Sequence, residues 1–324
     1  MIMDALSRDC LPTMPGIVFM GTPDFAMPTL RSLLTAGLDV RSVVTQPDRP
    51  KGRGKRTVPS PVKRLALDWN IEVLQPESVN TESFLSVLRE REPDLFVVVA
   101  FGQILKGDLL AVPRWGVLNV HASLLPRYRG AAPIQRAILN GEARTGLTLM
   151  RVDEGLDTGP VLFQEALEIA PEETAGSLHD RLASLAGERI VGWLKAMATE
   201  PVREIPQEAA LATYAPKIDR ETMLVDWSEP ARRVSARVRA LDPYPGARTT
   251  YQGQGLKLFS AGVADERERE HAPGHVIVEA DRLLVDTGCG RVAVREIQAS
   301  GKRRMPVADF LRGFSMGTGS LLGT

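Results

Sequence analysis

Residues 94–100 read DLFVVVA, and every residue from Leu95 to Val99 is apolar. An uninterrupted apolar run of this length is typical of a central parallel strand that is covered on both faces. Upstream, residues 16–20 form a short β-prone run, residues 21–24 read GTPD, and apolar residues then recur at helical spacing from Phe25 to Leu34. This alternation of strand and helix predicts a doubly wound, Rossmann-like α/β fold with a mostly parallel sheet.

The carboxyl ends of the predicted strands are the places to look for chemistry. In doubly wound sheets, ligands bind beyond these ends, which here are the segments after Val120 and after Met150. The first turn, GTPDFA at residues 21–26, lacks the G-x-G-x-x-G fingerprint and carries a proline where helix N–H groups would meet a pyrophosphate. A dinucleotide cofactor is therefore disfavoured.

The chain is predicted to contain two domains. A long amphipathic helix over Ser177–Met197 closes the first, and the irregular segment after it carries Pro201, Pro206 and Pro216. Beyond it, short β-prone runs alternate with glycine-containing and acidic turns. We predict a disordered extension over residues 1–14, a catalytic domain over 15–200, a linker over 201–219, and an OB-like β-barrel domain over 220–324.

Composition excludes several classes of protein. The longest apolar run is only strand-sized, so no membrane association is expected. The 40 basic residues balance 40 acidic ones, which argues against a uniformly basic surface that binds nucleic acid. Cys10 and Cys289, the only cysteines, offer no disulfide framework and fit a reducing cytoplasm. His271 and His275 are four residues apart, but Pro273 and Gly274 break any helix between them. We therefore predict no metal site.

Two segments carry unusual polar residues. Residues 116–133 read GVLNVHASLLPRYRGAAP and place Asn119 and His121 two apart at a predicted strand end, which points both side chains to one face. Residues 152–160 read VDEGLDTGP, a loop in which Asp157 can turn inward while Asp153 and Glu154 stay solvated. A scaffold role for the histidine and turn chemistry for the loop are the alternative interpretations.

The motifs in these segments resemble those of the folate-dependent formyltransferases. The resemblance rests on NVH, SLLPRYRGAAP and GLDTG, and extends to TQPDRPKGRGK, ALDPYPGA and GKRRMPVADFLRG, covering nearly all of the chain after Pro15. It implies that Asn119 donates to the oxyanion, that His121 adds a second donor, and that Asp157 orients His121 and relays the amine proton. A neutral His121 acting with Asp157 as proton acceptor is the alternative.

The resemblance also implies that 10-formyltetrahydrofolate is the formyl donor. Attack by an amine on this donor requires no metal, and we expect none. A pterin needs a flat apolar slot edged by backbone donors and acceptors. The residues expected to form it are Phe101, Gly102, Ile104, Ser123, Leu124, Leu125 and Pro126.

The resemblance further implies that the acceptor is the α-amino group of initiator methionyl-tRNA, and we expect the protein to be a monomer. A basic segment, RPKGRGKR at residues 49–56, and the C-terminal domain favour tRNA. The predicted tRNA-binding residues are Arg49, Lys51, Arg53, Lys55, Arg56, Lys302, Arg303 and Arg304. Three alternatives stay open: the basic segment as solvated surface, a formyltransferase acting on a small amine such as a nucleotide amino sugar, and a tRNA-binding protein without catalysis.

Overall fold

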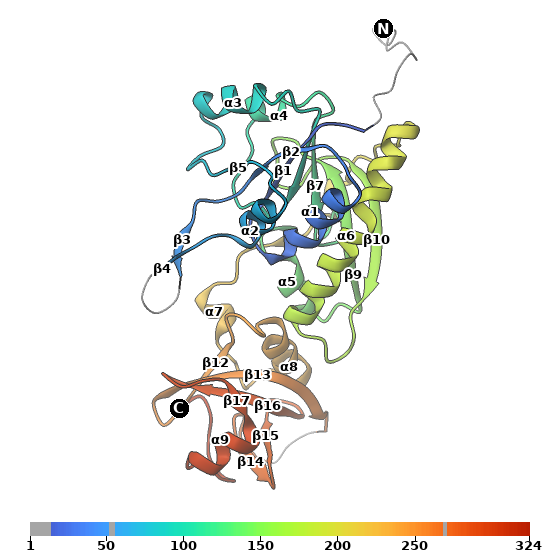
Figure 1. The fold of residues 1–324 in the computed structure, drawn as a ribbon. Helices are drawn as coiled ribbons and strands as arrows, with labels where there is room; N and C mark the ends of the chain where they lie inside the picture. Colours follow the sequence, from blue (N-terminus) through green and yellow to red (C-terminus); the bar gives the residue numbers. More distant parts are fainter. Residues whose placement is uncertain (1–13, 52–55, 268–270) are drawn as a thin grey trace. The chain divides into compact units, whose positions relative to one another are not determined.

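The computed structural model describes residues 14–51, 56–267 and 271–324. The predicted extension therefore lies outside the described residues except for Met14, as do Cys10, Arg53 and Lys55. The chain forms two compact units (Figure 1). Unit 1 comprises the described residues up to Arg129, Gly146–Glu165 and Asp180–Ala212, and unit 2 comprises Gly130–Thr145, Ala166–His179 and Thr213–Thr324.

A seven-stranded sheet in the order β10-β9-β7-β6-β1-β2-β5 forms the centre of unit 1. Its strands are β1 (Ile17–Gly21), β2 (Val40–Val44), β5 (Val73–Leu74), β6 (Leu95–Val99), β7 (Val117–His121), β9 (Arg144–Arg151) and β10 (Val161–Glu168). The strands from β7 to β5 pair in parallel, whereas β9 is antiparallel to β7. The predicted Rossmann-like, mostly parallel sheet is confirmed.

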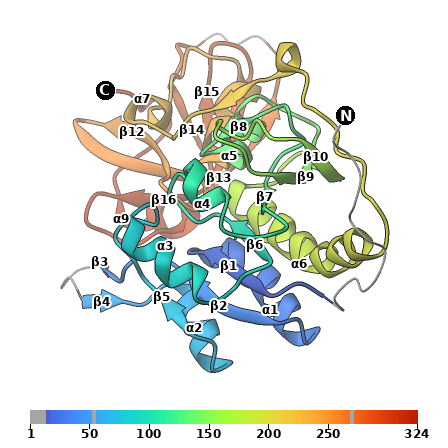
Figure 2. The ribbon, with the colours of Figure 1, turned by 90° about the horizontal axis from the view of Figure 1, so that it is seen from above.

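Helices lie on both faces of this sheet (Figure 2). Helices α3 (Glu82–Arg89) and α4 (Gly107–Leu110) cover the face that carries Met20, Phe96 and Val98. The opposite face is covered by α1 (Met27–Thr35), which follows the 3-10 turn η1 (Asp24–Ala26), by α2 (Pro61–Asp68) and by α6 (Ala175–Thr199). A Cβ at Gly187 of α6 would lie 2.9 Å from the Pro28 carbonyl oxygen, so only glycine lets α6 approach α1 this closely.

The strand order reverses between β1 and β6, because the chain proceeds from β1 to β2 and β5 on one side and from β6 to β7 on the other. Such a reversal opens a crevice at the carboxyl ends of the two strands, where ligands of this fold class bind. The hydroxyl of Thr22, just after β1, donates to the Phe101 carbonyl oxygen at 3.0 Å. This bond fixes the two strand-end loops against each other.

Unit 2 combines helices with an antiparallel sheet. The six-stranded sheet has the order β12-β13-β16-β15-β14, with β17 paired to β16. Its strands are β12 (Ala247–Tyr251), β13 (Gln254–Asp265), β14 (Val276–Glu279), β15 (Arg282–Asp286), β16 (Arg291–Ala299) and β17 (Met305–Pro306). No pairing among the described residues closes this sheet, so the antiparallel domain is confirmed and its barrel form is not.

The helices of unit 2 come from three parts of the chain. They are α5 (Pro133–Leu139), the start of α6, α7 (Arg220–Met223), α8 (Ala231–Ala240) and α9 (Val307–Gly313). Helix α8 buries Val234 and Val238 in a core with Leu258 and Val294 of the sheet. Helix α5 packs against α8, so residues 130–145 belong to unit 2, whereas the predicted boundaries assign them to the first domain.

The remaining elements are short. They are the hairpin of β3 (Arg49–Lys51) and β4 (Arg56–Val58), the paired strands β8 (Arg129–Gly130) and β11 (Tyr214–Ala215), and the 3-10 turn η2 (Ala209–Leu211). Within the described parts of the chain, no helix is both long enough and apolar enough to cross a membrane.

A charged network anchors β17 to the core of unit 2. Arg304 pairs with Asp242 at 2.6 Å and with Glu296, and its guanidinium lies 4.2 Å from the centre of the Phe259 ring. The side chain of Asp242 is only 4% exposed. The hydrogen bond from Arg304 holds the pKa of Glu296 below its ordinary value of 4.5.

We expect Arg304→Met to destabilise unit 2 by about 1–3 kcal/mol at neutral pH, because it leaves the buried Asp242 carboxylate without its guanidinium. The stabilisation that comes from the pairing of Arg304 with Glu296 is fully present above pH 4.5. It is lost as the pH falls through the lowered pKa of Glu296 in the folded state. Urea unfolding at pH 7 and pH 4 measures both effects. Arg303→Met, at the exposed neighbouring position, is the control. An equal loss for the two variants at pH 7 would contradict the prediction.

Candidate active site

Strand β7 presents Asn119 and His121 on one face, at the carboxyl edge of the sheet beside the strand reversal. Asn119 pairs with Val98 of β6 and with Met150 of β9, so it is held in register from two sides, and His121 pairs with Thr148 of β9. Asn119 is half-buried and His121 is buried. The predicted pairing of these side chains at a strand end agrees with this geometry.

The two nitrogens of His121 have different surroundings. Nε2 lies 3.0 Å from the Tyr128 carbonyl oxygen, and because a carbonyl only accepts, Nε2 must carry the hydrogen. Nδ1 faces the Asp157 carboxylate at 3.7 Å, beyond direct hydrogen-bond distance. Nδ1 is therefore the atom that is placed to interact with a reacting group.

The loop after β9 turns Asp157 toward His121. Asp157 adopts a left-handed conformation with φ of 53°, which is uncommon for a residue other than glycine. A Cβ at Gly159 would lie 2.0 Å from the Arg151 carbonyl oxygen, so only glycine allows the loop to return this close to β9. Asp153 instead accepts from the Thr158 hydroxyl at 2.6 Å and shapes the turn. The inward orientation predicted for Asp157 matches this arrangement.

Gln207 holds the Asp157 loop and was not expected from the sequence. Its amide nitrogen donates to the carbonyl oxygens of Asp157 at 2.9 Å and Gly159 at 2.7 Å. Its amide oxygen accepts from Arg129 Nη2 at 2.8 Å and from Nε at 3.0 Å. Gln207 lies in the predicted linker between two ordinary residues, Pro206 and Glu208, and no local pattern distinguishes it.

Replacing Gln207 with leucine is expected to lower kcat by about 10- to 100-fold, because the loop that aims Asp157 loses its side-chain anchor. Gln207→Glu is the matched variant: it keeps an acceptor for Arg129 but removes both donors to the loop. We expect both variants to be slow in steady-state assays. If Gln207→Glu kept normal kcat, the anchoring role would be wrong.

The predicted folate residues occupy two loops with different exposure. Phe101 and Leu125 are buried in apolar clusters, Ser123 is buried, and Leu124 and Pro126 are half-buried. Several backbone groups in these loops are already bonded, since Leu125 N donates to Thr148 and Leu125 O accepts from Gln164. These bonds hold the loop after β7 against β9 and β10.

Two large apolar side chains stand exposed beside this region. Ile104 is 77% exposed, and Leu156, next to Asp157, is 58% exposed. A Cβ at Gly107 would lie 2.5 Å from Glu154 Oε1, so the segment after Ile104 and the Asp157 loop are neighbours. Gly102 between Phe101 and Gln103 has φ of 90°, a conformation that suits glycine. Exposed apolar groups beside a polar triad are typical of a ligand-binding surface.

The predicted tRNA-binding residues fall in both units. Arg49 is exposed on β3, and Lys51 pairs through its backbone with Arg56 across the hairpin, while Arg53 and Lys55 lie outside the described residues. Lys302 and Arg303 of unit 2 are exposed. Arg304 is engaged by Asp242 and Glu296, which leaves its charge largely compensated.

Comparison with known proteins supports one family for nearly all of the chain. The Formyl transferase profile matches residues 16–194, and the profile of the Formyl transferase C-terminal domain matches residues 217–315. The methionyl-tRNA formyltransferase of Pelotomaculum thermopropionicum is 46% identical over 95% of this chain and 98% of that protein. The enzyme of the same name from Acetivibrio thermocellus is 47% identical over 95% of this chain and 99% of its own length.

The chain belongs to the methionyl-tRNA formyltransferase family. It is a formyl-transferring enzyme, as the motifs around Asn119, His121 and Asp157 predicted. The structure of HypX from Aquifex aeolicus in complex with tetrahydrofolic acid has a TM-score of 0.64 at 19% identity, covering 94% of this formyltransferase and 48% of HypX. At that identity the similarity establishes the fold alone.

Proposed function

We propose that this formyltransferase moves the formyl group of 10-formyltetrahydrofolate to the α-amino group of initiator methionyl-tRNA, for translation initiation in the cytoplasm. The observation that carries the proposal is the convergence of Asn119, His121 and Asp157 at the carboxyl edge of the sheet, with Nδ1 of His121 3.7 Å from Asp157. The names of the relatives support tRNA as the acceptor. The tetrahydrofolate complex of HypX supports a folate donor.

The α-amino nitrogen attacks the formyl carbon, and the carbonyl π electrons move to the formyl oxygen. Asn119 and a doubly protonated His121, through Nδ1, donate hydrogen bonds to this oxyanion. The carbonyl then re-forms as the bond between the carbon and N10 of the folate breaks. The proton lost by the amine reaches N10 through Asp157. Because a free α-amino group has a pKa of about 8, little activation of the nucleophile is required.

Asp157 has two roles in this proposal. It stabilises the positive charge of His121 from 3.7 Å, a separation that leaves Nδ1–H available to the oxyanion. It also receives the amine proton and delivers it to the leaving nitrogen. The anchoring of its loop by Gln207 fixes the carboxylate for both tasks.

We further propose that the donor binds against the surface of Ile104 and Leu156, with Phe101, Gly102 and residues 123–126 forming the base of the slot. Ile104 is exposed in a chain that buries most of its large apolar side chains, and it lies in the loop after β6 at the strand reversal. Covering it with a flat pterin removes apolar surface from water.

Ile104→Asp is expected to raise KM for the folate donor by about tenfold or more with little change in kcat, because burying an isoleucine side chain contributes about 1.5–3 kcal/mol. Steady-state kinetics with the concentration of the donor varied at saturating tRNA measures this KM. The control is Leu67→Asp, at an equally apolar position of α2 that is 55% exposed. An unchanged KM would remove Ile104 from the donor site.

For tRNA, we propose phosphate contacts from Arg49, Lys51, Arg53, Lys55, Arg56, Lys302 and Arg303, and a structural role for Arg304. The open antiparallel sheet of unit 2 acts in this proposal as an OB-like module that contacts phosphates. A monomer suffices for this function, and light scattering of the purified protein tests that expectation.

An assay of formyl transfer identifies the acceptor. Purified protein is incubated with the 10-formyl donor and either initiator methionyl-tRNA or a nucleotide amino sugar. We expect formyl transfer to the tRNA-borne amine and none to the sugar. Faster transfer to the sugar would replace the proposed acceptor, and tRNA binding without transfer to either amine would favour a non-catalytic protein.

A further inference from the structure

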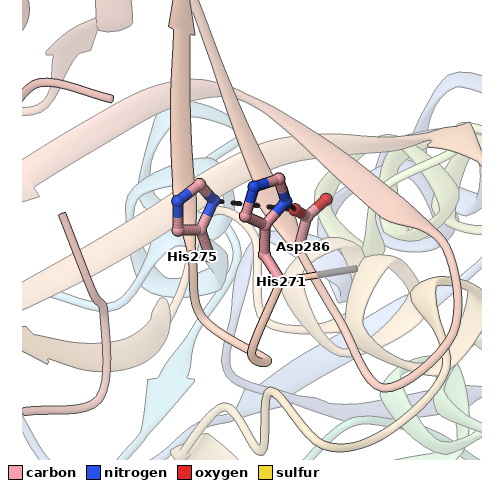
Figure 3. Close-up of side chains that lie close together, drawn as sticks. All are labelled: His271, His275 and Asp286. Carbon is pink, nitrogen blue, oxygen red and sulfur yellow. Dashed lines mark ion pairs between the residues drawn. The ribbon is translucent and has the colours of Figure 1, made fainter. Parts of the chain in front are cut away.

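Two histidines that were predicted not to share a site lie side by side in unit 2. The sequence argument was that Pro273 and Gly274 prevent a helix between His271 and His275, and the structure has a turn there. The turn itself brings the rings together: their centroids are 4.1 Å apart and their planes differ by 7°. Figure 3 shows both rings beside the carboxylate of Asp286, the last residue of β15.

The three side chains bring their possible ligand atoms close together. Nδ1 of His271 lies 3.2 Å from Asp286 Oδ2, and Nδ1 of His275 lies 3.6 Å from the same oxygen. One ligand atom from each residue falls within 4.8 Å of the other two. In a tetrahedral zinc site with bonds of about 2.0–2.1 Å, neighbouring ligand atoms are about 3.3 Å apart. The two distances from the histidine Nδ1 atoms to Asp286 Oδ2, 3.2 Å and 3.6 Å, lie on either side of this value.

The backbone fixes this geometry. Gly274 N donates to Asp286 O at 2.8 Å, and Asp286 N donates to His275 O at 2.9 Å, so the turn is bonded to the end of β15. Gly274 has φ of 89°, and a Cβ there would lie 2.5 Å from the Leu322 carbonyl oxygen. Only glycine fits this position.

The carboxylate is oriented by a second partner. Asp286 is fully buried, and its Oδ1 accepts from Arg291 Nε at 2.6 Å, which directs Oδ2 toward the histidines. Outer contacts of this kind hold ligand groups in place at metal sites. The Arg291 guanidinium offsets the charge of the carboxylate, so the cluster offers two imidazoles and one charge-compensated carboxylate.

Access and bonding also fit an ion. The side chain of His271 is 50% exposed, which gives an ion a route to the cluster. Nδ1 of His275 is buried and makes no hydrogen bond to any residue in the described ranges. Its 3.6 Å separation from Asp286 is too long for a direct hydrogen bond, and a bound ion would satisfy this nitrogen.

We propose that His271, His275 and Asp286 bind a divalent transition-metal ion, with Zn²⁺ as the ion that suits two imidazoles and a carboxylate. A solvent molecule or an external group completes the coordination. The ion fastens the turn at residues 271–275 to the end of β15. The proposal is independent of the mechanism proposed above for formyl transfer.

The test uses the full chain with Cys10 and Cys289 replaced by serine, because cysteine thiolates bind zinc themselves and would add a second binding site. Protein treated with a chelator and dialysed is titrated with Zn²⁺ by calorimetry. We expect one ion per chain and a thermal unfolding midpoint that rises with Zn²⁺. The visible spectrum of the Co²⁺ form reports tetrahedral coordination by nitrogen and oxygen.

His271→Ala is the decisive variant, because the side chain is half exposed and its removal leaves the core intact. We expect it to weaken Zn²⁺ binding at least about tenfold and to abolish the zinc-dependent rise in the midpoint. His179→Ala, at the histidine outside both this cluster and the active site, is the matched control and should bind normally. Absence of saturable Zn²⁺ binding by the parent protein, or equal affinity in His271→Ala, overturns the proposal.

Discussion

Replacing Asn119 or His121 with alanine is expected to lower kcat by about 100-fold or more, with the affinity for methionyl-tRNA nearly unchanged. The reason is that each side chain is proposed to donate to an oxyanion that exists only along the reaction path, and the loss of one such donor costs about 10²- to 10³-fold. Asp157→Asn should fall in the same range, because it keeps the shape of the side chain but neither stabilises a charged His121 nor relays a proton. Single-turnover assays separate these effects from product release.

His121 also donates to the Tyr128 carbonyl oxygen from a buried position, so its removal affects folding as well as chemistry. Thermal unfolding of each variant is therefore measured alongside kcat. Asp157→Asn is the safer variant, because its side chain is 18% exposed and its size is kept. His179→Ala serves as the control for a histidine outside the site. Near-normal kcat in any of the three active-site variants would withdraw that residue from the mechanism.

The second large effect is expected for the basic segment, with Arg49, Lys51, Arg53, Lys55 and Arg56 changed together to alanine. Each phosphate contact that releases a counterion contributes about 0.7–0.9 to the slope of log affinity against log salt. If all five residues make such contacts, the slope flattens by about 3.5–4.5. At low salt, the affinity for tRNA should then fall by several orders of magnitude, as measured by filter binding over a salt series.

A kinetic comparison separates binding by this segment from positioning. If the segment only binds, saturating tRNA should restore part of the rate of the five-residue variant. Arg53→Ala alone tests whether one side chain reads bases or positions the terminal adenosine, in which case turnover stays low at saturation. The charge control replaces Arg64 and Arg232, outside the segment, with alanine. An unchanged salt slope in the five-residue variant would return the segment to the interpretation of solvated surface.

Sequence patterns predicted the parts of this protein that depend on local periodicity. The run at residues 95–99 became the buried strand β6, and the two-residue spacing of Asn119 and His121 placed both on one face of β7. These features follow from the alternation of side chains along a strand. The pattern also indicated that Asp157 lies in a glycine-flanked loop, although its left-handed conformation is visible only in the structure.

Features that depend on distant contacts were not predictable in this way. Gln207 bonds to a loop that lies 48 to 50 residues earlier in the chain, and an isolated glutamine in a proline-containing stretch gives no signal. His271 and His275 were judged by helical geometry, whereas a turn bonded to Asp286 brings them together. Whether an antiparallel sheet closes depends on pairing between its edge strands, which spacing along the chain does not reveal.

The assignment of α5 to unit 2 has a consequence for dividing the protein. Arg136 on this helix donates to the carbonyl oxygens of Pro216 at 3.2 Å and Lys217 at 3.3 Å, and Arg233 of α8 donates to Leu139 at 3.4 Å. A fragment ending at residue 200 keeps α5 but loses all of these hydrogen-bond partners and the packing against α8. The catalytic half is therefore not a transplantable module, and recombination between family members at the linker would succeed only when the segment 130–145 is exchanged together with the C-terminal part.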